Sequence, residues 1–435
     1  MNRTPFTAAV MLCSLAAPDA HAAESEPTSI RRFALIAAAN DGGADRTQLR
    51  YAESDAETLA AVLRQLGGVS TEDESVLVQP SPADLDAAFD DLRAKLDAAA
   101  SSADRLELIV YYSGHSDAEG LLLGGARYRY ADLKAALAEL PADVRIAILD
   151  SCASGAMTRT KGGTRRPPFT VDASNRVRGY AVLTSSSEDE AAQESDRIGA
   201  SFFTHYLVSG LRGAGDLSRD GRVTLNEAYH FAFHETLART ENTLGGAQHP
   251  AYDIQLVGTG DVVMTDLRST GAGLRLDEAV FGRFFLRDAA GRLAVELRKD
   301  AGREVELGLE PGDYDVTVEQ DGVRYRGDVS LVEGQITPLA LGDLERVDGE
   351  PTTLRGSSPH PSPRRVVPVD VGLIPPLSIN GTDEPTLNYL ALSLGMSYAR
   401  DLHGAGFALG VGWLENELRG FQTALGFLHA GGRVE

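Results

Sequence analysis

Strand-length apolar segments alternate with amphipathic helical segments over residues 31–266, and this alternation constrains the fold more than any other feature. The segments RRFALIAAAN, RLELIVYYSGH, VRIAILD and GYAVLTSSS are nearly continuous apolar runs, as in strands buried on both faces, and ESVLVQP is a shorter strand candidate. The sequence therefore predicts an α/β domain whose mainly parallel sheet is sandwiched by helices.

Helical periodicity fills the spaces between these strands. Ser54 followed by Glu57 has the spacing of a capping box, which predicts a helix start there, and Gly67-Gly68 predicts its end. Residues 81–100 and the segment YADLKAALAEL have the same helical spacing, and two further helices are expected from Ser201 and from Leu225.

Residues 1–22 have the pattern of a secretory signal peptide. An apolar stretch follows a basic residue, and Ala20-His21-Ala22 forms a small-residue cleavage site. We therefore expect an exported protein, located in the periplasm or at the cell surface of a bacterium, or secreted. The alternative is a retained anchor, although the stretch is too short to span a bilayer as a helix. If Cys13 leaves with the signal, Cys152 has no partner in the chain, which excludes a disulfide framework.

Length and charge limit the class of protein. A chain of 435 residues with 43% hydrophobic content can bury the cores of two or three domains. Its formal net charge of -22 argues against a nucleic-acid partner, because binding to phosphates requires a basic surface. The same acidity also keeps an exported protein soluble.

Two strands end on residues that can act together in catalysis. VYYSGH ends at His115, and AILDSC ends at Cys152. If these strands are neighbours, both side chains lie at the carboxyl edge of the sheet, where ligands bind in such folds. The imidazole can then activate the thiol for attack on a carbonyl carbon, and backbone N–H groups at Gly114 to Ser116 and at Cys152 can stabilise the resulting oxyanion. Taken singly, a solvated loop histidine and a buried structural cysteine remain the alternatives.

The motifs YYSGHSD and ILDSCASG, together with LRYAESDAETLAAVLRQLG, resemble those of the caspase-like cysteine peptidases, especially the metacaspase and bacterial caspase-domain branch. The resemblance covers about residues 31–260. It implies protein or peptide substrates and no required cofactor, with His115 as general base and acid and Cys152 as nucleophile. That family usually has glycine directly after the histidine, whereas this chain has Ser116, whose side chain borders the oxyanion site.

Substrate preference follows from charge. Caspases that cut after aspartate have glutamine two residues before the nucleophile, whereas this chain has Asp150 there, which resembles metacaspases and favours Arg or Lys at the cleaved position. Asp41, after the first strand, matches a second acid of that branch. A turn cap for Asp150 and an Asx turn for Asp41 are the alternatives. Glu188, Asp189 and Glu190 lie on a loop expected to border the cleft or to be solvated.

Residues 157–179 form a basic segment in an acidic protein, with Gly-Gly and Pro-Pro pairs that disfavour regular structure. A peptidase that prefers basic residues could cut this segment itself. The candidate sites of self-cleavage are Lys161, Arg165 and Arg166. A variable surface loop is the alternative.

One sequence matches a calcium-binding loop. DLSRDGRVTLNE has the spacing of the twelve-residue EF-hand loop, and Ca²⁺ is the one cofactor that the sequence suggests. The oxygen ligands would come from Asp216, Ser218, Asp220, the carbonyl of Arg222, Thr224 and Glu227. A metal-free helix start is the alternative.

Three further segments follow the α/β domain. Residues 270–342 contain short alternating strands and hairpin turns, which predict a small β-sandwich that serves attachment or spacing. Residues 343–368 form a Pro/Ser-rich linker. Residues 369–435 offer about three glycine-rich strands, similar to those of outer-membrane barrels or bacterial surface repeats, and suggest outer-membrane or cell-surface association.

Two functions remain after this reading. The favoured one is an exported cysteine endopeptidase that cuts after Arg or Lys. The alternative is a catalytically inactive module of the same fold that binds peptides at the cell surface, which Ser116 favours and the retention of both His115 and Cys152 disfavours.

Overall fold

The computed structural model describes residues 29–152, 154, 157, 178–187, 190–241, 243, 245–258 and 261–347, and the backbone of strands between 365 and 434. It divides into two compact units, residues 1–348 and 349–435, and each is described by itself. The signal-peptide pattern lies outside the described residues. Within them, the helices are all too short or too polar to cross a membrane.

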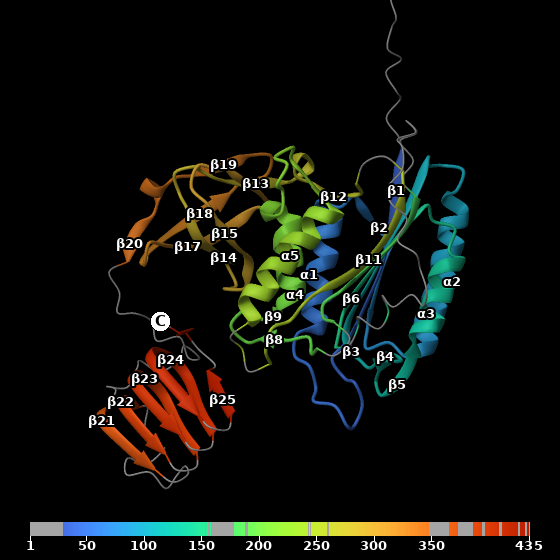
Figure 1. The fold of residues 1–435 in the computed structure, drawn as a ribbon. Helices are drawn as coiled ribbons and strands as arrows, with labels where there is room; N and C mark the ends of the chain where they lie inside the picture. The colour runs from blue at the N-terminus through green and yellow to red at the C-terminus, as the bar shows by residue number, and fades with distance from the viewer. Residues whose placement is uncertain are drawn as a thin grey trace, which may run out of the picture. The chain divides into compact units, whose positions relative to one another are not determined.

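A central sheet organises the first unit, with strand order β11-β7-β6-β3-β1-β2 (Figure 1). Five of these strands run parallel, and only the edge strand β11 is antiparallel to its neighbour. A hairpin of β4 (Gly120–Leu123) and β5 (Ala126–Arg129) extends β3. The strands are β1 (Ile30–Ala39), β2 (Val69–Val78), β3 (Arg105–Ser116), β6 (Val144–Asp150), β7 (Arg178–Thr184) and β11 (Ala251–Val257). The predicted mainly parallel sheet is confirmed.

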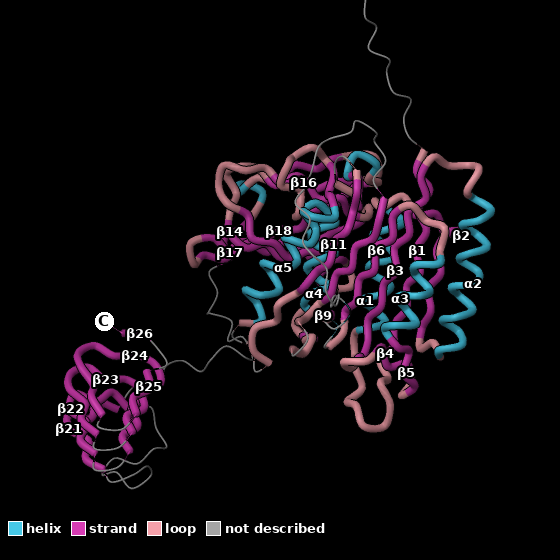
Figure 2. Tube along the Cα trace, turned by 45° about the vertical axis from the view of Figure 1, so that its right-hand side comes forward, coloured by secondary structure: helices cyan, strands magenta, loops and turns pink. Residues whose placement is uncertain are grey.

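Helices cover both faces of this sheet. Helices α1, α4 and α5 pack on one face and α2 and α3 on the other, and a separate apolar core lies under each layer (Figures 1 and 2). The helices are α1 (Ala52–Gln65), α2 (Pro82–Ala99), α3 (Tyr130–Glu139), α4 (Phe202–Ser209) and α5 (Leu225–Thr240). The central strands β1, β3 and β6 are apolar at most positions because each contributes to both cores.

Helix α1 begins earlier than the sequence predicts. Ser54 does not cap it, because the helix starts at Ala52 and the Ser54 hydroxyl donates instead to the Tyr51 carbonyl at 3.0 Å. The free N–H groups of the first turn are satisfied from elsewhere in the fold: Glu194 accepts from Tyr51 at 3.1 Å, and Asn40 accepts from Ala52 at 3.0 Å. Tertiary contacts therefore replace the local cap.

A β-rich domain follows the helical layer in the same compact unit. A three-stranded sheet, β16-β13-β19, and a five-stranded sheet, β15-β14-β17-β18-β20, enclose a core that includes Leu274, Phe284 and Val316. The strands are β13 (Ala272–Leu276), β14 (Gly282–Asp288), β15 (Leu293–Lys299), β16 (Val305–Leu309), β17 (Gly312–Gln320), β18 (Val323–Leu331), β19 (Ile336–Leu339) and β20 (Glu345–Val347). Strand β20 lies within the segment predicted as linker, where it pairs with β18.

A buried ion network joins this domain to the helices. Glu296 on β15 is completely buried and pairs with Arg239 of α5 and, at 2.8 Å, with Arg283 of β14. The backbone N–H of Glu296 also donates to the hydroxyl of Ser209 in α4 at 3.3 Å. Next to this network, burial lowers the pKa of His205 to about 4, so its imidazole is neutral at physiological pH. The β-rich domain is thus fixed to α4 and α5 by charged groups as well as by apolar contacts.

The second unit contains consecutive strands that pair in parallel. Gly404 pairs with Gly420 and Val411 with Phe427, each 16 residues apart along the chain, whereas Arg365 and its partner Thr386 are 21 residues apart. Consecutive strands can pair in parallel over so short a distance only if the chain winds in coils, as in a repeat array. The strands are β21 (Arg365–Gly372), β22 (Thr386–Ser393), β23 (Met396–Ala408), β24 (Val411–Ala424), β25 (Phe427–Ala430) and β26 (Arg433–Val434).

We expect Glu296→Gln to lower the free energy of unfolding by about 3 kcal/mol, because the change leaves Arg239 and Arg283 without their shared buried carboxylate. Urea denaturation followed by circular dichroism measures the effect. Lys95→Gln removes an exposed ion pair with Asp91 and serves as control, with an expected change within about 1 kcal/mol. Equal effects of the two substitutions would contradict a stabilising role of the buried network.

Candidate active site

The pairing of β3 with β6 brings the two predicted catalytic residues to one edge of the sheet. Ser113 and Asp150 are the last paired positions of these parallel neighbours. His115 and Cys152 each follow two residues later, so they lie at the same level beyond the last paired positions of two adjacent strands. This juxtaposition is the one that the sequence required for a nucleophile and its base.

The loop between β1 and α1 holds the His115 ring. The Nε2 atom lies 2.8 Å from the carbonyl oxygen of Thr47. Because a carbonyl only accepts, Nε2 carries the proton, and Nδ1 is the free base of the neutral ring. Gly42 leaves room for the imidazole, since a Cβ there would lie 2.4 Å from the ring Cδ2. Thr47 therefore selects the tautomer of His115.

Cys152 is a free thiol that is only partly exposed. Its Sγ atom lies 4.0 Å from the carbonyl oxygen of Ala192, within reach of a weak S–H hydrogen bond. Burial raises the pKa of the Cys152 thiol, and the nearby charge of Asp150 adds to this effect. The resting thiol is therefore protonated, and it needs a base to become a nucleophile.

Ser116, directly after His115, ties the two strand ends together. Its buried hydroxyl donates to the carbonyl oxygen of Cys152. From the other side, the N–H of Ser151 donates to the Ser185 hydroxyl at 3.0 Å, and the Ser186 hydroxyl donates to the Ser151 carbonyl at 3.2 Å. The serines of YYSGHS and TSSS thus fix the backbone at Ser151 and Cys152. The oxyanion role of the Ser116 and Cys152 N–H groups stays a prediction.

Two buried carboxylates, Asp55 and Asp150, lie close to the segment that carries Cys152. Asp150 accepts a hydrogen bond from the Thr204 hydroxyl at 2.6 Å and another from the Ser201 hydroxyl. Asp55, from the first turn of α1, accepts from the Ser201 backbone N–H at 3.1 Å. Burial raises the pKa of Asp150, and burial together with the charge of Asp150 raises the pKa of Asp55 well above the ordinary range. One oxygen of Asp150 is buried without a hydrogen bond.

Asp41 is not part of this pair. It is exposed, and its carboxylate accepts from the Gly43 N–H at 2.8 Å, the Asx turn that the sequence left open as an alternative. Its role in substrate binding stays a prediction. The acid that the fold places next to Asp150 is Asp55, which sequence reasoning missed. The sequence feature that could have pointed to Asp55 is its position in the first turn of the helix that follows the first strand.

The acidic loop at Asp216–Glu227 is held together by its own hydrogen bonds. Glu227 accepts from the Ser218 N–H at 2.9 Å and from the Thr224 N–H at 3.0 Å, and Asp216 accepts from the Arg219 N–H at 2.7 Å. Thr224 and Glu227 form a capping box that starts α5, the metal-free alternative. Within the described residues, no three His, Cys, Asp or Glu side chains are grouped to hold a metal.

Several predicted residues lie outside the described part of the chain. These are Lys161, Arg165 and Arg166 in the basic segment and Glu188 and Asp189 in the acidic loop. Glu190 is described, and its carboxylate lies 2.7 Å from the Nδ1 atom of His249.

A thiol and an imidazole at adjacent strand ends of a parallel sheet form the arrangement of a cysteine hydrolase. A family model for the caspase domain, Peptidase C14, matches residues 31–257, more than half of the chain. The chain therefore belongs to the caspase-domain family of cysteine peptidases, whose substrates are proteins.

A search of solved structures finds 156 matching chains. One of them is caspase-1 from Spodoptera frugiperda, at 15% identity and a TM-score of 0.40, with 55% of this chain and 91% of that chain covered. A search of curated proteins finds no match.

We expect Asp55→Asn to raise the melting temperature by a few degrees, of the order of 1 kcal/mol, because it removes a charge that burial disfavours. Because its folded pKa is raised, Asp55 destabilises the fold once the carboxyl of the unfolded chain ionises while the folded one still binds its proton. The gain over wild type should therefore be absent below about pH 4, grow as the pH rises from there to the raised folded pKa, and stay constant above it. Calorimetry between pH 3 and 8 measures it, and a gain independent of pH would contradict the assignment.

Proposed function

We propose that the protein is a cysteine endopeptidase that cuts after Arg or Lys, with His115 and Cys152 as its catalytic dyad. The observation that carries the proposal is the pair of buried carboxylates, Asp55 and Asp150, behind Cys152. Among the hydrogen bonds of the described residues, this pair receives hydroxyl and amide donors but no cation. A guanidinium or ammonium group from a substrate would supply the missing positive charge.

The chemistry follows from the tautomer of His115. In the proposed reaction, Nδ1 removes the thiol proton, and the sulfur of Cys152 attacks the carbonyl carbon of the scissile bond. The N–H groups of Cys152 and Ser116 stabilise the negative oxygen of the tetrahedral intermediate. The imidazolium then gives its proton to the departing amine. A water molecule, deprotonated by the same imidazole, hydrolyses the thioester and restores the thiol.

The charge of the carboxylate pair supports the preference for basic residues. A bound cation lowers the free energy of the ionised carboxylates, whereas an acidic side chain in the same place would add a third negative charge to a buried site. The raised pKa values of Asp55 and Asp150 also predict that cleavage after Arg weakens as these groups protonate at low pH.

We expect fluorogenic peptides with Arg or Lys at the cleaved position to react at least about 100-fold faster, in kcat/KM, than the matched Asp peptide. Cys152→Ala should abolish hydrolysis. Asp55→Asn and Asp150→Asn should each lower kcat/KM for the Arg peptide by about 10- to 100-fold, with Asp41→Asn as the exposed matched variant. If Asp41→Asn costs as much as Asp55→Asn, the assignment of the pocket to Asp55 is wrong.

Self-processing in the basic segment is part of the proposal. Its support is the sequence alone, because Lys161, Arg165 and Arg166 follow the nucleophile closely in a segment rich in basic residues. We expect wild-type protein to separate into two fragments on a denaturing gel and Cys152→Ala to remain intact. Mass spectrometry should place the new ends after one of these three residues. Intact wild type that hydrolyses the Arg peptide would contradict self-processing without affecting the peptidase assignment.

An inactive peptide-binding module is the second candidate. The raised pKa of the Cys152 thiol favours it, because a protonated thiol is a poor nucleophile. The same peptide assay separates the two functions, since a binding module would hold the Arg peptide without releasing the fluorophore.

Three predictions from the sequence complete the proposal. Export to the periplasm or cell surface, or secretion, would place the peptidase outside the cytoplasm. Residues 369–435 would associate it with the outer membrane or cell surface. Calcium bound at Asp216–Glu227 would act on α5, and adding Ca²⁺ or a chelator to the peptide assay tests this role.

A further inference from the structure

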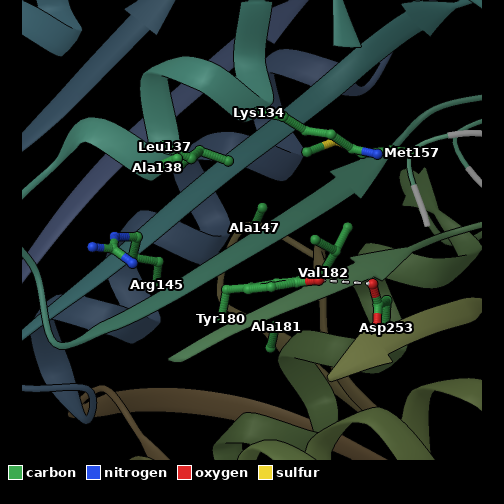
Figure 3. Close-up of a pocket in the computed structure, with 10 residues that line it drawn as sticks. All are labelled: Lys134, Leu137, Ala138, Arg145, Ala147, Met157, Tyr180, Ala181, Val182 and Asp253. Atoms are coloured by element: carbon green, nitrogen blue, oxygen red, sulfur yellow. Dashed lines mark hydrogen bonds between the residues drawn. The ribbon is translucent and has the colours of Figure 1, made fainter. Parts of the chain in front are cut away.

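A pocket of about 420 Å³ lies on the face of the central sheet that carries α3, away from the buried carboxylate pair. Strands β6 and β7 form its floor and α3 one wall (Figure 3). Its apolar lining includes Leu137, Ala147, Met157, Val182 and the ring of Tyr180. This volume and this lining suit a small organic molecule.

The charged groups around this pocket differ in whether they have partners of opposite charge. Lys134 of α3 has no ion-pair partner among the described residues, and Figure 3 shows it extending toward Met157. Arg145 donates only to the carbonyl of Leu140, at 2.8 and 3.1 Å. The one carboxylate of the lining, Asp253, already accepts from the Tyr180 hydroxyl at 3.3 Å.

The balance of charge around this pocket is opposite in sign to the net charge of the whole protein. The chain has 63 acidic and 41 basic residues, yet the pocket combines two cations that lack carboxylate partners in the described part of the chain with one carboxylate, Asp253, that already accepts a hydrogen bond. A cation without a partner beside an apolar cavity favours an anionic ligand, because the apolar walls screen the attraction less than water does.

We infer that this pocket binds an amphipathic carboxylate, whose apolar body contacts Ala147, Val182 and Tyr180 and whose anionic group lies at Lys134. An aliphatic and an aromatic acid share this chemistry. The site uses none of the catalytic residues and does not depend on peptidase activity.

The pocket is also connected to the nucleophile. Met157, a buried part of its wall, is five residues from Cys152, and β6 ends at Asp150. A ligand that fills the space beside Met157 should therefore change the rate of peptide hydrolysis. This second effect rests on the proposed function, whereas ligand binding does not.

Binding is tested with the full chain carrying Cys152→Ala, so that the result is independent of hydrolysis. The probe is 8-anilinonaphthalene-1-sulfonate, an apolar aromatic anion whose fluorescence rises in apolar sites. We expect saturable binding at one site, displaced by decanoate or by 4-phenylbutyrate. The more effective of the two acids identifies the ligand as aliphatic or aromatic. Decanol, which lacks the charge, should compete at least about 10-fold less well than decanoate.

Two substitutions locate the site. Lys134→Met keeps the length of the side chain and removes its charge, and it should weaken decanoate binding about 5- to 10-fold. Ala147→Leu adds bulk to the floor and should abolish displaceable probe binding. Lys95→Met, on α2 and outside the pocket lining, is the matched control and should bind as wild type does.

The proposal is overturned if Lys134→Met and Lys95→Met bind decanoate equally, or if decanol competes as well as decanoate. If Ala147→Leu fails to fold, Lys134→Met still decides, because its side chain is exposed and its removal should not disturb the core. Loss of hydrolysis in the wild type with binding intact would count against the peptidase and leave this site standing.

Discussion

The parallel pairing of β3 with β6 is the constraint on which the rest of the structure depends. Because Ser113 and Asp150 are paired in parallel strands, His115 and Cys152 follow at the same level of one edge, and a shift of one residue would turn one of the two side chains to the opposite face. The helices on either face bury these strands completely, which keeps the register fixed. Loop contacts then fix the side chains, because Thr47 orients the His115 imidazole and Ser116 donates to the carbonyl of Cys152.

The buried acids depend on the same framework. Ser201 starts α4 and offers its N–H to Asp55 and its hydroxyl to Asp150, so one helix start positions both carboxylates. At the other end of α4, Ser209 accepts from the backbone of Glu296. The β-rich domain therefore contacts the helix that carries the acid site. Two carboxylates in one buried site lower the stability of the fold. Such an energetic cost is typical of sites that bind a partner of opposite charge.

The two helix starts differ in where their capping partners come from. Ser81 caps α2 through reciprocal hydrogen bonds with Asp84, and all the partners lie within four residues. Ser54 has similar spacing to Glu57, and the sequence predicted a cap there, but it does not cap α1, since Asn40 and Glu194 supply the acceptors from distant segments. The predicted cap at Ser54 is therefore replaced by tertiary partners that its spacing to Glu57 does not reveal.

The sequence by itself determined the α/β class, the apolar strands and the ends at which His115 and Cys152 lie, because periodicity and strand polarity are local properties. Tertiary structure alone decided that Asp55 joins Asp150, that Thr47 sets the imidazole tautomer and that Glu296 is shared with Arg239 of α5. Each of these contacts joins residues far apart in the chain. The energetic effect of these contacts depends on burial and on neighbouring charge. Neither property can be read from a single position of the sequence.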